Sequence, residues 1–155
     1  MKKQKSISDI LTSMGACCEA VEWSRQFKSR QKAWDACERG DHLLWILGRT
    51  VTNGSQQHRA VVLAACKCAR LSLKHVTKGE TRPLAAIQTA EWWCRGKASI
   101  EDVRTAAYAA SYAAYVAADS ADAASYAAYA ARIKMLKRCV EIVRKSFPKP
   151  PTIEG

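Results

Sequence analysis

The sequence predicts an all-α protein with a single domain. Apolar residues recur at steps of three and four through most of the 155 residues, and no segment shows the strict alternation of a β-strand. A chain of this length is long enough to bury one hydrophobic core. We expect a bundle of six to eight helices over residues 16–147. A basic segment over 1–15 that can hold a short helix precedes it, and a proline-rich tail over 148–155 follows.

The first third of the chain carries the start and stop signals of short helices. Apolar and charged residues follow helical spacing over residues 17–27, and Ser29 is suited to cap a second short helix. Gly40 is expected to end that second helix, and Asp41 is expected to cap the helix that follows. We therefore predict three helices before the loop at residues 52–54.

Tryptophans and acids are mixed in this region. Because large aromatic side chains dominate core packing, we expect the tryptophans in the core, with partner contact as the alternative: Trp23, Trp34 and Trp45. The acids could form a catalytic or metal-binding pair, but helix caps and solvated helix faces are the preferred interpretation: Glu19, Glu22, Asp35 and Asp41.

Two longer helices are predicted in the middle of the chain. Over residues 56–76 the apolar residues share one face and the bases the other, which is typical of a surface helix. The apolar face consists of Val62, Ala65, Cys66, Ala69 and Leu73. The next helix lies within residues 81–96, because Pro83 suits a first turn and Gly96 follows the last one.

A helical tract follows that could run from Ile100 to Phe147, and its segment from Ala106 to Ala131 consists almost entirely of alanine and tyrosine. One straight helix of that length would extend roughly 70 Å, against a radius of gyration of about 15 Å for a compact domain of this size. Cap-forming residues cluster within 119–122, so we expect the tract to turn there into a helical hairpin. The alternative is one continuous stripe, which would place Asp119 and Asp122 in an apolar seam.

The positive charge is concentrated in a few segments. The formal net charge is +11, and the bases gather in residues 1–5, 56–76 and 132–149. Such a distribution attracts an acidic protein surface or a phosphate backbone, although the last segment also fits the solvated side of a surface helix. The candidate partner contacts are Lys134, Lys137, Arg138, Arg144, Lys145, Tyr112 and Tyr126.

The residue pattern argues against catalysis and against a bound metal or cofactor. Three histidines stand far apart in the sequence, and no glycine-rich phosphate loop is present. Cys66 and Cys68 have the wrong spacing for a zinc knuckle, so we expect buried thiols on different helix faces. Seven irregularly placed cysteines favour a reduced cytoplasmic protein, and neither a signal peptide nor a membrane anchor is predicted.

Residues 16–47 resemble the family-five immunity proteins of bacterial polymorphic toxin systems. The similarity lies in an Ala-Cys-x-Glu-Ala start, an Ala-Trp-x-x-Cys turn and a Gly-Asp-x-x-Leu-Trp helix, which His42 modifies at a position where the family often has an aromatic residue. The segments VVLAACKCARLSL and TRPLAAIQTAEWWCRG and the alanine-rich C-terminal half are also similar to the family.

The resemblance implies a cytoplasmic helical protein that neutralises a toxin or defence effector by stoichiometric binding, in a bacterium or a phage-infected cell. Immunity proteins that block nucleases are often acidic, so this basic chain is expected to bind an acidic partner surface. Two other classes stay open. A nucleic-acid-binding protein would use the basic helices and stack bases on tyrosines, and a self-associating protein would use the Ala/Tyr surface.

Overall fold

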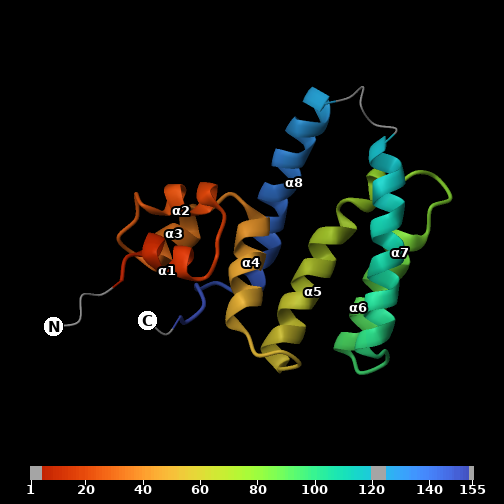
Figure 1. The fold of residues 1–155 in the computed structure, drawn as a ribbon, viewed down its shortest axis with the longest axis horizontal. Helices are drawn as coiled ribbons and strands as arrows, with labels where there is room; N and C mark the ends of the chain where they lie inside the picture. Colours follow the sequence, from red (N-terminus) through yellow and green to blue (C-terminus); the bar gives the residue numbers. More distant parts are fainter. Residues whose placement is uncertain (1–4, 120–124, 154–155) are drawn as a thin grey trace.

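The computed structural model describes residues 5–119 and 125–153, and their side chains over 5–111 and 129–153 (Figure 1). Within the described ranges the regular structure comprises eight α-helices and one short 3-10 helix, with no β-strand. The all-α prediction is confirmed. None of the described helices is both long enough and apolar enough to cross a membrane.

Three short helices form one end of the molecule. They are α1 (Ile7–Ser13), α2 (Cys18–Ser24) and α3 (Arg30–Ala36). Ser6 caps α1 in a capping box, and Ser29 caps α3 by accepting from the backbone N–H of Lys32. The predicted cap at Ser29 is confirmed. Helices this short are marginal alone, so packing against their neighbours must hold them.

The start of α4 (Gly40–Thr50) corrects two expectations. Gly40 does not end α3; it is the first residue of α4. Asp41 is not the cap, because Arg39 occupies that position and Asp41 accepts from the Arg39 guanidinium at 2.9 and 2.8 Å. The bidentate pairing engages the carboxylate that would otherwise accept from the helix N–H groups.

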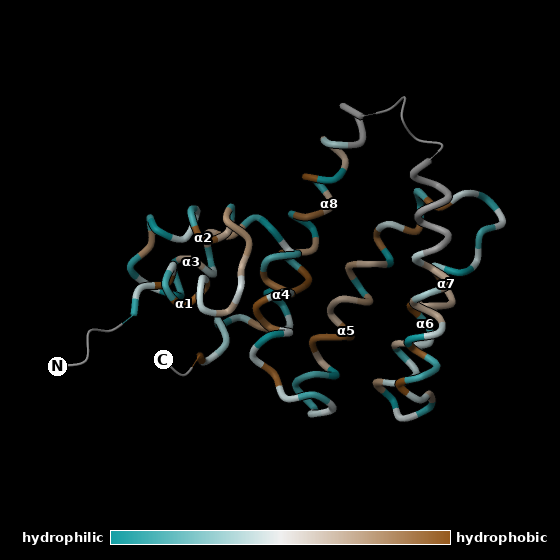
Figure 2. Tube along the Cα trace, viewed as in Figure 1, coloured by the Kyte–Doolittle hydropathy of each residue, from teal (hydrophilic) through white to brown (hydrophobic). Residues whose placement is uncertain are grey.

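Gly40 instead permits a close approach between α4 and α8 (Ser125–Ser146). A Cβ atom added at Gly40 would lie 2.4 Å from Cys139 Cβ and 3.0 Å from the Leu136 carbonyl oxygen. Figure 2 shows apolar segments of α4, α5 and α8 beside one another. The core here consists of Trp34, Cys37, Leu43, Leu47, Val61, Cys68, Cys139, Val140 and Val143.

The helix α5 (Gln56–Arg70) occupies the middle of the fold, where it packs on α4, α6 and α8. The predicted single apolar face was wrong. The buried residues are Val61, Ala64, Cys66 and Cys68, because α5 has neighbours on more than one side. A 3-10 turn over Leu73–His75 follows, so the α-helix is shorter than the 56–76 segment suggested.

The two buried thiols of α5 point to different neighbours, as predicted. Cys66 Sγ lies 3.8 Å from the Ile87 carbonyl oxygen of α6 (Arg82–Cys94), whereas Cys68 Sγ lies 3.9 Å from the Cys139 carbonyl oxygen of α8. Burial raises the pKa of Cys66 to about 11. Burial and the hydrogen bond with Cys139 raise the pKa of Cys68 to about 12. Both thiols therefore stay protonated at neutral pH.

The Ala/Tyr tract forms two helices, as expected. The first, α7 (Ile100–Asp119), packs on α6, whereas α8 packs on α4 and α5 (Figure 1). The predicted turn includes Asp122, which lies outside the described residues with the rest of 120–124. The two helices of the tract therefore pack on different neighbours.

The C-terminal tail turns back onto the N-terminal helices. Trp34 Nε1 donates to the Phe147 carbonyl at 3.2 Å, and Arg30 donates to the Ile153 carbonyl at 3.2 Å. Figure 1 shows the C-terminal end beside α1–α4. The proline-rich tail thus covers part of the N-terminal end.

The close approach at Gly40 predicts an asymmetry between two glycines of α4. Gly40→Ala should lower the free energy of unfolding by about 1–3 kcal/mol, because the new methyl group would overlap Cys139. Gly48→Ala should raise it by about 0.5–1 kcal/mol, because alanine favours a helix and nothing lies within 4 Å of its Cβ. Urea denaturation measures both. Equal effects at the two glycines would contradict the close approach.

Candidate partner-binding surface

The helix α8 has a buried face and an exposed basic face. Cys139, Val140 and Val143 are buried against α4 and α5. Steps of three and four place most of the bases away from those residues, as predicted. Four of the exposed bases of α8 are called the basic face here: Lys134, Lys137, Arg138 and Lys145.

The members of the basic face differ in their partners. Lys137 Nζ lies 3.1 Å from a carboxylate oxygen of Glu38, and both side chains are exposed. Within the described residues, Lys134, Arg138 and Lys145 form no ion pair. An exposed pair such as Lys137–Glu38 contributes little to stability. The basic face therefore keeps most of its positive charge exposed to solvent.

Arg144, which the sequence groups with these bases, has a different environment. Its Nη2 atom lies 2.5 Å from the Trp34 carbonyl oxygen, 2.6 Å from that of Asp35 and 2.8 Å from that of Cys37. These carbonyls lie at the C-terminal end of α3, where a cation compensates unpaired acceptors and the helix dipole. Arg144 thus holds α8 to α3, so it is left out of the candidate partner contacts.

A groove lies beside the basic face, between α2, the segment joining α3 to α4, and α8. Its volume is about 480 Å³. Trp23 and Phe27 form an aromatic pair in it with ring centroids 4.7 Å apart. From α8, Ile133 and Lys137 line the groove. Tyr129 precedes Ile133 by one turn and is 63% exposed, so apolar surface continues along α8 from the groove.

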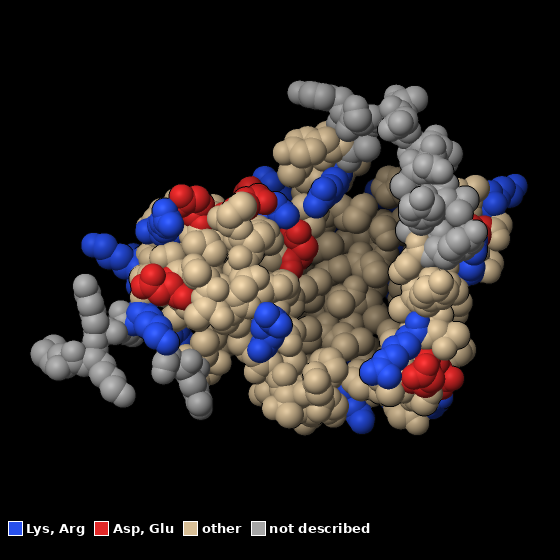
Figure 3. Space-filling view, in the orientation of Figure 1, with Lys and Arg blue, Asp and Glu red and all other residues tan. Residues whose placement is uncertain are grey.

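Figure 3 shows a second recess on the same view of the molecule, between α8 on one side and α6 and α7 on the other. Its visible floor carries no charged side chain, and both basic and acidic side chains stand on its margins. Tyr108 of α7 is exposed. The candidate contacts Tyr112 and Tyr126 lie in the part of the chain whose side chains are not described.

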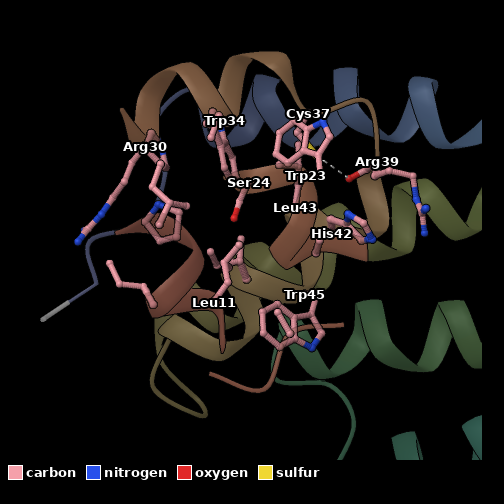
Figure 4. Close-up of a pocket in the computed structure, with 18 of the residues that line it drawn as sticks. Leu11, Trp23, Ser24, Arg30, Trp34, Cys37, Arg39, His42, Leu43 and Trp45 are labelled. Atoms are coloured by element: carbon pink, nitrogen blue, oxygen red, sulfur yellow. Dashed lines mark hydrogen bonds between the residues drawn. The ribbon is translucent and has the colours of Figure 1, made fainter. Parts of the chain in front are cut away.

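A separate apolar cavity of about 360 Å³ lies among α1–α4 and the tail (Figure 4). The three tryptophans line it, and they differ in burial. Trp34 is only 4% exposed and joins the core, whereas Trp23 and Trp45 are half-buried. In Figure 4 the Arg30 and Arg39 guanidinium groups point away from the cavity. The predicted core position is therefore confirmed for Trp34, whereas Trp23 and Trp45 are only partly buried.

Between the cavity and the groove lies a polar cluster centred on Arg39. Its guanidinium donates to Asp41 on one side and to Glu19 at 2.7 Å on the other. These hydrogen bonds, above all that to Asp41, raise the pKa of Arg39, and Arg39 lowers the pKa of Asp41. Burial and the Arg39 charge lower the pKa of His42. The imidazole is therefore neutral at physiological pH.

The structure brings His42 beside two residues that the sequence separates from it. Cys17 Sγ lies 3.9 Å from His42 Nε2, and Glu19 is the other member of the group. The sequence pattern did not predict this cluster, because 25 positions separate Cys17 from His42. The short Cys17-x-Glu19 spacing at a helix start was its one visible sign.

Comparison with known proteins identifies the family. The family model described as "Imm-5 like putative immunity protein" matches residues 52–137, which is more than half of the chain. The chain belongs to this family of immunity proteins. No curated protein and no solved structure matches it. The match covers α5, α6, α7 and the first half of α8, whereas residues 16–47, which carry most of the motif resemblance, lie outside it.

The position of Arg144 predicts a stability difference between two adjacent bases of this immunity protein. Arg144→Gln should lower the free energy of unfolding by about 2 kcal/mol, because three carbonyl oxygens lose a charged donor. Lys145→Gln should change it by less than about 0.5 kcal/mol, because Lys145 is exposed. Thermal and urea unfolding measure the difference. A loss at Lys145 as large as that at Arg144 would contradict the assignment.

Proposed function

We propose that the protein is a non-catalytic immunity protein that binds and neutralises a toxin or defence effector in the cytoplasm of a bacterium or a phage-infected cell. The contact region consists of the basic face of α8 and the adjoining groove. Membership of the immunity-protein family supports a protein partner. The choice of surface rests on two features of α8: a row of exposed bases, and a groove that Ile133 and Lys137 line together with Trp23 and Phe27.

The chemistry of this region fits a protein partner. Trp23, Phe27, Ile133 and Tyr129 supply apolar and aromatic contact area, which is typical of the centre of an interface. Lys134, Arg138 and Lys145 are exposed on the same helix, α8, and would set orientation and association rate by attracting acidic groups. A partner with an acidic rim around an apolar projection is complementary to this arrangement.

The competing function is nucleic-acid binding, which the same bases favour. The affinity for nucleic acid rises with each base that contacts a phosphate, so it depends on the total positive charge more than on one particular groove. A protein partner seated in the groove depends instead on which bases are present. Charge changes at two separate places therefore distinguish the two functions.

The test compares two triple variants with the same change in net charge. Lys134→Glu, Lys137→Glu and Arg138→Glu together alter the basic face, whereas Lys67→Glu, Lys74→Glu and Lys78→Glu alter exposed bases of α5 and the turn after it. Each tagged protein is purified from its native host with and without nuclease, and bound proteins are identified by mass spectrometry. Circular dichroism confirms that both variants keep their helix content.

We expect the wild type and the α5 variant to retain one nuclease-resistant protein partner. The α8 variant should retain about tenfold less, because several interface charges change sign. Equal recovery with both variants would remove the basic face from the interface. Loss of all binding after nuclease treatment would favour the nucleic-acid function.

A further inference from the structure

Three side chains with metal-binding atoms meet where the first turns of α2 and α4 approach each other. Cys17 precedes α2, Glu19 lies in its first turn, and His42 lies in the first turn of α4. The Cys17 sulfur, a Glu19 carboxylate oxygen and a His42 ring nitrogen all lie within 4.8 Å of one another. Across the described part of the chain, this is the one group of three such residues found that close together.

The distances suit a tetrahedral metal ion. Zinc bond lengths of about 2.0–2.3 Å to nitrogen, oxygen and sulfur impose roughly 3.5 Å between two ligand atoms. Cys17 Sγ and His42 Nε2 are 3.9 Å apart, so small side-chain rotations bring both to bonding distance. Cys17 and Glu19 are exposed, which leaves a path for an ion from solvent.

The local charge also suits a divalent ion. The protein as a whole is strongly basic, yet this cluster gathers Glu19 and Asp41 around a single cation, Arg39. When Cys17 is a thiolate, three negative charges face one positive charge, and a divalent ion neutralises the remainder. Arg39 contacts one oxygen of Glu19, Oε1, which leaves Oε2 for the metal. Asp41 is held by Arg39 and acts as a counter-charge, not as a ligand.

The ligand types select among metals. A thiolate, an imidazole and a carboxylate together favour zinc over magnesium or calcium, which prefer oxygen ligands. Three protein ligands leave a fourth tetrahedral position for water. We propose that Cys17, Glu19 and His42 bind a zinc ion at the junction of α2 and α4. As the ion binds, the Cys17 thiol loses its proton to solvent.

The proposal does not depend on the immunity function, because the site needs no partner protein. It also gives a role to His42, which stands at a position where the family often has an aromatic residue. Binding would link α2 to α4 across a region that contributes to both the apolar cavity and the groove. Metal loading would therefore stiffen one side of the candidate partner surface.

Cobalt titration of the reduced, full-length protein tests the proposal directly. Co²⁺ replaces zinc in such sites, and a bound thiolate gives a charge-transfer absorption that free Co²⁺ lacks. We expect this absorption in the wild type and its loss on addition of Zn²⁺. Cys17→Ser should abolish it, whereas Cys18→Ser, which removes the exposed neighbouring thiol, should leave it unchanged.

Two further variants test the other ligands. Losing an outer-shell partner alone raises a metal Kd by about 10–100-fold, so His42→Ala and Glu19→Gln should each raise it by at least about tenfold. Circular dichroism of each variant checks that it folds. Absence of thiolate absorption in the wild type, or equal absorption in Cys17→Ser, would overturn the proposal. An unchanged Kd in His42→Ala or Glu19→Gln would overturn the three-ligand assignment.

Discussion

The close contact between α4 and α8 at Gly40 determines how α8 is placed against the other helices. Only a residue without a Cβ atom allows the two backbones to come this close, because Cys139 and Leu136 occupy the space beside it. The approach buries one face of α8 against α4 and α5 and exposes the opposite, basic face. It also brings α8 past the short N-terminal helices, where Arg144 and Trp34 complete the junction. The close approach at Gly40 therefore determines both the packing of α8 and which of its faces is exposed.

Because α8 has one buried face and one exposed face, its bases lie in different environments. Arg144 lies within reach of the end of α3 and satisfies carbonyl oxygens there, so its charge serves the fold. Lys134 and Arg138 lie on the other side of the same helix and keep their charge exposed. Ile133 and Lys137 line the groove. A single helix thus joins the core to the proposed interface.

Periodicity and cap chemistry predicted much of the fold. Ser29, Pro83 and Gly96 marked helix ends correctly, because their effects act within one turn of the chain. Gly40 and Asp41 were misread for a corresponding reason. Their roles depend on Cys139, far away in the sequence, and on the geometry of Arg39, neither of which a local pattern contains.

The candidate site was less predictable than the fold. Helical spacing located the basic face of α8 but could not separate Arg144 from its neighbours, since the carbonyls of α3 approach α8 only in three dimensions. The groove required residues of α2, of the segment joining α3 to α4 and of α8 to come together, and the Cys17–Glu19–His42 cluster required α2 to meet α4. Distant contacts of this kind leave little trace in the spacing of one sequence.

Site-specific photo-crosslinking tests whether the basic face of α8 contacts a protein partner. A photoreactive side chain is placed in turn at Lys134, on the basic face, and at Lys78, an exposed position after α5, and the protein is irradiated in its host cell. We expect a single nuclease-resistant protein adduct from Lys134 and little adduct from Lys78. Equal adducts from both positions, or nucleic acid as the crosslinked species at Lys134, would rule out the basic face as a protein-binding surface.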